Sequence, residues 1–120
     1  DKIILLGRRN DIPELLSAAD IYVSSSLGES FSNAIGEAMA CELPCIVTDV
    51  GDSKLIVGNT GKVVAAKDYI GMSKELLNYI NNPGISQNRE ARHRIAINYD
   101  IKVISKIFEK HFEELVNFSH

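Results

Sequence analysis

Two glutamates, Glu29 and Glu37, enclose a stretch that is rich in small polar residues and whose carboxylates and hydroxyls could form hydrogen bonds. The stretch reads Ser30-Phe31-Ser32-Asn33, and the residues after it are rich in Ala and Met, which favours a helix with Ser30 or Ser32 as its cap. A helix N-terminus exposes backbone N–H groups and a partial positive charge, so it attracts a phosphate or diphosphate. These residue types therefore predict an anion site at the start of a helix.

The two carboxylates are expected to have different partners. A phosphate placed directly on Glu29 would be repelled, so this residue is predicted to face sugar hydroxyls. Glu37 lies about two turns into the helix on the stripe of Asn33, where a carboxylate accepts two hydrogen bonds from vicinal ribose hydroxyls. With nine glutamates in 120 residues, this spacing arises easily by chance, so ordinary solvated helix carboxylates are the alternative interpretation.

Four short apolar runs predict the strands that would position this site. They are residues 3–6, 21–23, 45–48 and 62–64. The first and third runs are continuous, as in strands that are buried on both faces of a parallel sheet. Ligands bind at the carboxyl ends of such strands, so the candidate positions are the loops at residues 7–11, 24–33 and 48–53.

Helical signals separate or follow these runs. Asp11 and Glu14 are spaced as a capping box with Pro13 in the first turn, which predicts a short helix there. Its apolar stripe is Leu15, Leu16 and Ala19, and two later helices are marked by Met72, Leu76 and Ile80 and, after the cap Asp100, by Ile104, Ile107, Phe108, Phe112 and Leu115. Strands alternating with helices predict one α/β domain over residues 1–120, a Rossmann-like parallel sheet flanked by helices.

Composition narrows the classes of function. The chain has 13 basic and 16 acidic residues and a net charge of -3, so no basic surface for nucleic acid is expected. There is no transmembrane run and no signal peptide, so the expected location is cytoplasmic. Cys41 and Cys45 lack a second pair at metal-ligand spacing and are predicted to be small buried thiols, with no metal. Because the chain begins at Asp1 rather than Met, it is expected to be a fragment.

The stretch from Glu29 to Gly51 resembles the donor-site signature of the family 4 retaining glycosyltransferases, the group 1 glycosyl transferases. It reads Glu-Ser-Phe-Ser-Asn-Ala-Ile-Gly-Glu-Ala-Met-Ala-Cys-Glu-Leu-Pro-Cys-Ile-Val-Thr-Asp-Val-Gly. The family pattern is Glu-Gly-Phe-Gly, then Glu-Ala-Met-Ala, Gly-x-Pro, a strand and Thr-Asp-Val-Gly. Segments at residues 5–7, 15–20, 22–25, 61–64 and 91–92 are similar to the family too.

The resemblance implies a GT-B enzyme with two Rossmann-like domains, in which this chain is the later part of the C-terminal, donor-binding domain. By analogy Glu29 contacts the transferred sugar, and Glu37 holds the ribose. The amides of Ser30, Phe31, Ser32 and Asn33 would hold sugar and diphosphate, with Arg8 and Arg9 beside the base. No metal or other cofactor is implied, because the helix dipole and basic side chains stabilise the departing diphosphate.

The implied substrates are a nucleotide-sugar donor of a hexosyl group and a saccharide or lipid-linked acceptor. The family binds its acceptor through an N-terminal domain and its diphosphate through Arg and Lys residues that precede the start of this chain. The isolated chain is therefore expected to be inactive. In the family, retention is explained by front-face attack with the leaving phosphate taking the acceptor's proton. A cytoplasmic role in polysaccharide biosynthesis is implied, and peripheral membrane association of the full protein stays open.

Five positions depart from the family pattern in or after the signature. Ser30 and Ser32 stand where the family has glycines, which keeps the N–H groups and adds hydroxyls. Glu42 replaces a glycine that often adopts a left-handed conformation, at a cost of about 1 kcal/mol. Asp52 and Leu55 stand where relatives have Gly and Glu, which leaves donor and acceptor details undetermined.

Three other functions are compatible with parts of the pattern. A nucleotide-sugar epimerase of GT-B fold shares the fold and the donor, and a non-catalytic sugar-nucleotide-binding subunit would use the same residues. A signalling receiver domain has this length and alternation. It needs an acidic pair after its first strand, where this chain has Gly7-Arg8-Arg9.

Overall fold

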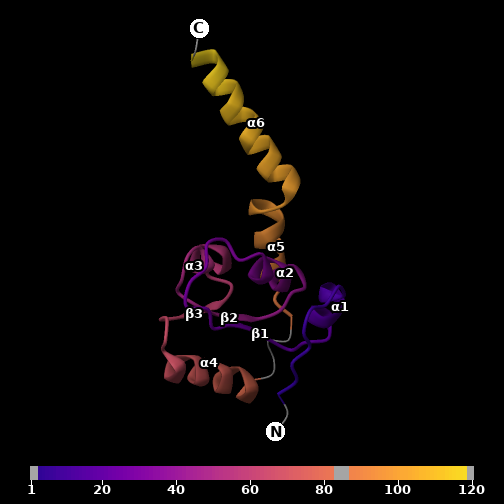
Figure 1. Cartoon of the computed structure of the whole chain (residues 1–120), viewed down its shortest axis with the longest axis vertical. Coiled ribbons are helices and arrows are strands. Elements are labelled where there is room, and N and C mark those ends of the chain that lie inside the picture. Colours follow the sequence, from indigo (N-terminus) through magenta and orange to yellow (C-terminus); the bar gives the residue numbers. More distant parts are fainter. Residues whose placement is uncertain (1–2, 83–86, 119–120) are drawn as a thin grey trace.

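The structure is a computed structural model that describes residues 3–82 and 87–118. Three strands, β1 (Tyr22–Ser24), β2 (Cys45–Thr48) and β3 (Lys62–Val64), pair in the order β1-β2-β3. All pairs are parallel, and the register sets Val23 beside Ile46 and Val47 beside Val63. Figure 1 shows helices on both faces of this sheet, so the predicted α/β fold is confirmed.

The helices form two layers and one extension. Helix α4 covers one face of the sheet, and α2, α3 and α5 lie on the other (Figure 1). Helix α1 packs against α2, and α6 continues away from the sheet. Their bounds are α1 Ile12–Ser17, α2 Asn33–Ala40, α3 Ser53–Val57, α4 Tyr69–Asn81, α5 Arg89–Asn98 and α6 Ile101–Phe118.

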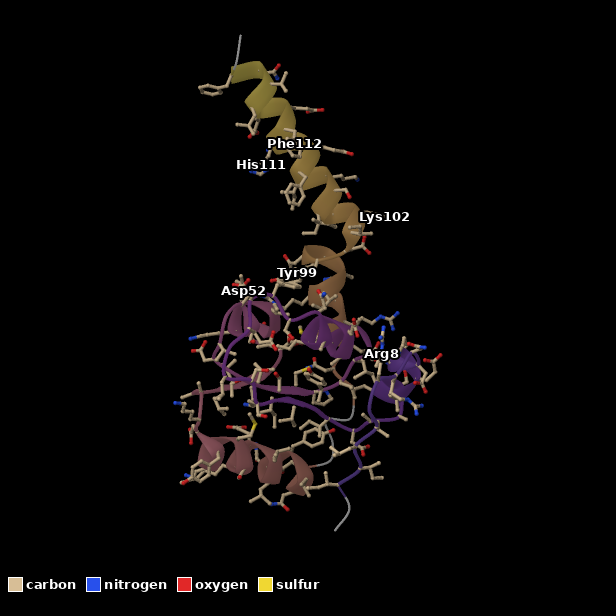
Figure 2. All side chains as sticks on the ribbon, viewed as in Figure 1. Arg8, Asp52, Tyr99, Lys102, His111 and Phe112 are labelled. Atoms are coloured by element: carbon tan, nitrogen blue, oxygen red, sulfur yellow. The ribbon has the colours of Figure 1, made fainter. Side chains whose placement is uncertain are left out.

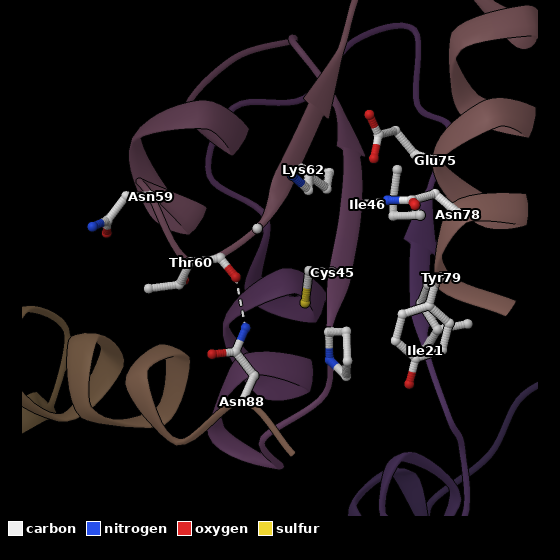
Figure 3. Close-up of a pocket in the computed structure, with 12 residues that line it drawn as sticks. Ile21, Cys45, Ile46, Asn59, Thr60, Lys62, Glu75, Asn78, Tyr79 and Asn88 are labelled. Carbon is white, nitrogen blue, oxygen red and sulfur yellow. Dashed lines mark hydrogen bonds between the residues drawn. The ribbon is translucent and has the colours of Figure 1, made fainter. Parts of the chain in front are cut away.

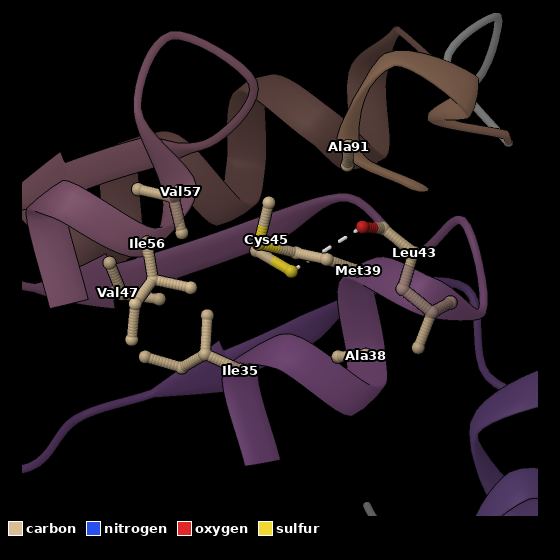
Figure 4. Close-up of a cluster of buried hydrophobic side chains, with 9 residues drawn as sticks. All are labelled: Ile35, Ala38, Met39, Leu43, Cys45, Val47, Ile56, Val57 and Ala91. Carbon is tan, nitrogen blue, oxygen red and sulfur yellow. Dashed lines mark hydrogen bonds between the residues drawn. The ribbon is translucent and has the colours of Figure 1, made fainter. Parts of the chain in front are cut away.

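The main core lies between β2 and the layer of α2, α3 and α5. Figure 4 shows Ile35, Met39, Val47 and Ile56 meeting there, and all four are fully buried. Every residue of β2 is buried because strands flank it and helices cover both its faces. Burial raises the pKa of Cys45 to about 12, and its thiol donates to the carbonyl of Leu43 at 3.4 Å. The prediction of a buried thiol is confirmed for Cys45, whereas Cys41 is half-buried.

A smaller core joins the other face of the sheet to α4. Met72 and Leu76, two residues of the predicted repeat, pack with Ile46 and Val64. Asp68 caps this helix by accepting from the Gly71 amide at 2.8 Å. The predicted helix is confirmed, although Ile80 from the same repeat is exposed.

The predicted strand at residues 3–6 is wrong. These residues form no strand in the described structure, and Ile3 and Leu5 are more than 90% exposed. Strand β1 lies at the edge of the sheet and pairs only with β2 among the described strands. A continuous apolar run becomes a strand only when a partner strand takes its backbone hydrogen bonds and layers cover both its faces.

Ser32 is the N-cap of α2 as predicted, but the helix starts differ from their predictions in their side-chain contacts. Asp11 precedes α1 but makes no side-chain cap, because its carboxylate binds Arg9 instead. Ser32 is the N-cap of α2 and likewise makes no side-chain cap hydrogen bond, while Ser30 lies outside the helix. Helix α1 ends at Ser17, so Ala19 is not part of its stripe.

Glu42 has the left-handed conformation predicted for its position, with a φ of 62° directly after Cys41, the C-cap of α2. Its carbonyl accepts from the Asn88 amide at 2.7 Å, and its carboxylate lies 3.3 Å from the guanidinium of Arg92. Both contacts lead to α5, so the strained residue also ties the end of α2 to its neighbouring helix.

Helix α6 agrees with its predicted period, and none of its described residues is buried. Asp100 accepts from the Lys102 amide at 2.8 Å, and the helix runs from Ile101 to Phe118. It projects from the three layers, which gives the molecule extents of 65 × 30 × 29 Å (Figure 1). No helix in the described residues is both long and apolar enough to span a membrane.

Candidate functional site

The loop between β1 and α2 contains Glu29, whose carboxylate is linked to the sheet by hydrogen bonds between hydroxyl groups. Ser26 Oγ donates to Glu29 Oε1 at 3.1 Å and lies 3.3 Å from Ser24 Oγ. Thr48, the last residue of β2, donates its hydroxyl to the Ser26 carbonyl at 2.6 Å. The carboxyl ends of β1 and β2 therefore both contact Ser26, the residue that binds this glutamate, at the edge where the sheet was predicted to bind a ligand.

The loop after β2 closes on the backbone of the same segment. Gly51 has a φ of 50°, and a Cβ built on it would lie 2.1 Å from the Glu29 carbonyl oxygen. The Asp52 amide donates to the Ser30 carbonyl at 3.0 Å. Only glycine fits such an approach, so the last glycine of the sequence signature is required by contact with Glu29.

Helix α2 presents Asn33 and Glu37 on one exposed side. Ile35, Ala38 and Met39 form its buried side, so residues 33 and 37, which are four apart, face outward together. Ser32 is buried at the N-cap without capping through its hydroxyl. The first-turn amides thus lack a side-chain cap at the end where the helix dipole is positive.

Phe31 supports the loop through its ring. Its centroid lies 5.6 Å from that of Tyr99 at an interplanar angle of 53°, a tilted aromatic contact. Tyr99 follows α5, so this contact joins the start of α2 to the junction with α6 (Figure 2). Because the ring of Phe31 packs on Tyr99, the predicted contact of Phe31 with a ligand would be made by its backbone amide.

Tyr22 is a residue of this region that the sequence interpretation missed. Its phenol is half-buried, and burial raises its pKa most, followed by Cys45, Glu29 and Glu37, while a hydrogen bond with Ser24 lowers it. Both glutamates therefore act on one phenol. The alternation of a strand could have indicated this, because residues 22 and 24 face the same side of β1.

The two arginines before α1 have separate surroundings. Arg9 donates from Nε to Asp11 Oδ1 at 2.8 Å, and this pairing raises the pKa of Arg9 and lowers that of Asp11. Arg8 forms no ion pair with the described residues and lies on the α1 side of the molecule (Figure 2). No hydrogen bond joins either arginine to Glu29 or Glu37 in the described structure, so this part of the predicted site is not assembled around the carboxylates.

Comparison with known proteins decides the family. The model of the family described as "Glycosyl transferases group 1" matches residues 1–82, more than two thirds of the chain. The chain belongs to this family. A signalling receiver domain is thereby excluded, and the resemblance of the Glu29–Gly51 stretch is confirmed at the level of the family.

Relatives of this glycosyltransferase chain are longer proteins. It is 31% identical to the UDP-Gal:alpha-D-GlcNAc-diphosphoundecaprenol alpha-1,3-galactosyltransferase of Escherichia coli, over 97% of the chain and 31% of that protein. It is 30% identical to the N-acetyl-alpha-D-glucosaminyl L-malate synthase of Bacillus anthracis, over 81% of the chain and 26% of that protein. The chain thus spans about a third or less of these relatives.

A solved structure confirms the fold of the glycosyltransferase chain. The sucrose-phosphate synthase of Thermosynechococcus elongatus superposes with a TM-score of 0.77 over 86% of the chain and 27% of that structure. The sequence identity is 23%, so the likeness concerns the fold alone. The chain has the parallel α/β architecture of part of a GT-B glycosyltransferase.

A cavity at the opposite edge of the sheet is distinct from the candidate site around Glu29 and Glu37. It has a volume of about 150 Å³ and lies at the starts of β2 and β3, beside Cys45 and Lys62 (Figure 3). Asn88 closes one side by donating to the Thr60 carbonyl at 2.6 Å. The carboxylates belong to the other ends of the strands, so this cavity does not contribute to them.

Histidine and metal-binding clusters do not add to the site. His93 and His111 are exposed on α5 and α6. In the part of the chain that the structure describes, no three His, Cys, Asp or Glu side chains come together in a way that could hold a metal ion.

Proposed function

We propose that this chain binds the nucleotide-sugar donor of a retaining hexosyltransferase. The observation that carries the proposal is the position of Glu29 and Glu37 on either side of the uncapped start of α2. The carboxylate of Glu29, which Ser26 binds, lies before the start of α2, and the carboxylate of Glu37 lies on the exposed side of the same helix. One end of this arrangement suits sugar hydroxyls, and the other suits a ribose.

The start of α2 is the proposed position of the diphosphate. Amides in the turn of Ser30 to Asn33 and the positive end of the helix dipole would stabilise its charge. No arginine or lysine pairs with either glutamate in the described structure, so at the start of α2 the proposed donors are these amides. Further cations would come from another part of the complete protein.

Arg8 is proposed to lie beside the base. It differs from Arg9, whose charge is already paired with Asp11, because it makes no ion pair with the described residues. A guanidinium without a partner is able to stack on a base or to pair with a phosphate. Arg9 would act mainly by fixing the loop in which Arg8 sits.

The proposed reaction keeps the anomeric configuration through attack on the face that the diphosphate leaves. The departing phosphate oxygen takes the proton of the acceptor hydroxyl as the new glycosidic bond forms and the bond to phosphate breaks. Glu29 would orient the sugar and stabilise charge that develops on it. No covalent bond to the protein forms in this scheme.

The acceptor is proposed to be a saccharide or a lipid-linked glycan bound by a separate N-terminal domain. One relative is named for an acceptor on diphosphoundecaprenol, which suits a cytoplasmic enzyme working near the inner face of a membrane. The 120-residue chain by itself is expected to transfer no sugar. Robust transfer by the purified chain would contradict this division of labour.

Calorimetry on the complete protein tests the ribose role. Nucleoside diphosphates are titrated into the natural protein, Glu37→Ala and, as a matched control, Glu109→Ala on α6. Loss of charged hydrogen bonds should weaken binding of the preferred nucleotide by about 10- to 100-fold for Glu37→Ala. Equal affinities for all three proteins would remove Glu37 from the site.

A turnover assay tests the sugar role and separates transfer from epimerisation. A panel of nucleotide sugars is incubated with candidate acceptors, and the products are separated from epimerised donor. Glu29→Ala should depress turnover more than nucleotide affinity. Conversion of the donor to its epimer without an acceptor would favour the epimerase instead.

A further inference from the structure

A short line of hydroxyls runs from the sheet to the glutamate that is proposed to bind the sugar. It passes from Ser24 Oγ to Ser26 Oγ over 3.3 Å and from there to Glu29 Oε1 over 3.1 Å. Ser24 is 8% exposed at the end of β1, whereas Glu29 is exposed. The line therefore connects a buried serine at the end of β1 to a carboxylate at the surface.

The donor and acceptor capacities of these groups determine which hydroxyl donates at each step of this line. An ionised carboxylate only accepts, so Ser26 must donate its single hydroxyl proton to Glu29. Ser26 Oγ can then only accept from Ser24, whose hydroxyl becomes the donor of the 3.3 Å contact. This hydrogen bond holds Oε1, and the other lone pairs of the carboxylate, including those of Oε2, are left for hydroxyls of the ligand.

The middle of the line is anchored by a second strand. Thr48, 4% exposed at the end of β2, donates to the Ser26 carbonyl at 2.6 Å. Ser26 is thus fixed through its side chain by β1 and through its backbone by β2. A loop residue that is held at two points by the ends of strands is suited to orient a neighbouring carboxylate.

We propose that Ser26 is the positioning residue for Glu29, with Ser24 setting its hydroxyl and Thr48 its backbone. The inference rests on the proposed function, because it gives the carboxylate of Glu29 a direction toward the donor sugar. A glutamate in an exposed turn otherwise samples several rotamers, and a small misplacement of a positioning group lowers the rate of transfer.

Turnover of the complete protein with its best nucleotide sugar tests the inference. The variants are Ser26→Ala, which removes the donor, Ser26→Thr, which keeps a hydroxyl, and Ser25→Ala as control. Ser25 is the exposed neighbour of the same residue type. Urea unfolding midpoints are measured first, and all assays are run at a temperature at which every variant is folded.

The expected result is a loss in kcat of about tenfold for Ser26→Ala, with the Kd for nucleoside diphosphate unchanged. Ser26→Thr should restore most of the turnover, and Ser25→Ala should match the natural protein. In a Glu29→Ala background, Ser26→Ala should cause no further loss, because it acts through that carboxylate.

Two outcomes would overturn the inference while leaving the proposed function intact. One is natural turnover in Ser26→Ala when Glu29→Ala is slow. The other is the same fold loss from Ser26→Ala with and without Glu29, which indicates a purely structural role. Natural turnover in Glu29→Ala would instead overturn the sugar role of Glu29 itself, and the positioning role of Ser26 with it.

Discussion

The loop that carries Glu29 and helix α6 place their side chains in opposite surroundings. In the loop, Ser26 binds the carboxylate, Gly51 contacts the backbone, and Phe31 packs on Tyr99. In α6 the apolar side remains exposed, as Figure 2 shows for Phe112. Both segments have clear sequence patterns. The difference between them shows that a pattern predicts the type of element but not what packs against it.

The largest expected contrast between the two regions is in core truncation. Ile35→Ala should lower the free energy of unfolding by about 3 kcal/mol, because Ile35 is fully buried under α3 and β2. Phe112→Ala should change it by less than about 0.5 kcal/mol, because Phe112 is 62% exposed. Urea unfolding followed by circular dichroism measures both, and similar losses would show that α6 is packed in solution.

The second contrast concerns two glycines near the site. Gly51→Ala should lower the free energy of unfolding by about 2 to 3 kcal/mol, because it combines a positive φ with backbone atoms in the way. Gly28→Ala should have little effect, since a Cβ there meets nothing within 4 Å. The same unfolding experiment compares them, and equal midpoints would contradict the close contact between Gly51 and Glu29.

Much of the fold could be predicted because its elements are encoded locally. Strands β2 and β3 were predicted at their observed bounds, and α4 and α6 follow apolar repeats. Helix α3 was missed, because five residues after a turn are too short to show a period. The run at residues 3–6 failed for the opposite reason: it has a strand's composition, but strand formation depends on a partner.

The proximity of the loops after β1 and β2 was predictable, whereas their contacts were less so. Parallel topology brought the loops after β1 and β2 together as expected, which the Asp52–Ser30 hydrogen bond shows. The contact of Gly51 with Glu29 depends on backbone paths that spacing does not reveal. The pairing of Arg9 with Asp11 was likewise hidden, because a capping pattern and a local ion pair have the same residues.

A third prediction tests whether the core around Cys45 excludes water, in contrast to the exposed apolar side of α6. The Cys45 pKa rises from its ordinary 9.0 to about 12, so folding favours the neutral thiol. This stabilisation is complete below pH 9 and is lost as the pH rises from 9 toward 12. Between pH 8 and 10.5 the free energy of unfolding should fall by about 2 kcal/mol through this group.

Urea unfolding at the two pH values, in the natural chain and in Cys45→Ala, isolates that contribution. Cys45→Ala should reduce the decline, whatever its effect on stability at pH 8, while Cys41→Ala should retain the natural decline. Tyr22 and Tyr79 also have raised pKa values and add to the decline in every variant. An unchanged slope in Cys45→Ala would mean that water reaches the thiol.

The smallest expected effect tests whether every polar group near the loop has a partner. Ser53, at the start of α3, is 1% exposed, and its hydroxyl has no hydrogen-bond partner among the described residues. Ser53→Ala should therefore raise the free energy of unfolding by about 1 kcal/mol. Thr48→Val, which removes a buried hydroxyl that does have a partner, should lower it by about the same amount. Opposite signs in the same assay would show that the region around Glu29 is fixed by selected hydroxyls rather than by burial alone, whereas two losses of equal size would assign Ser53 a partner.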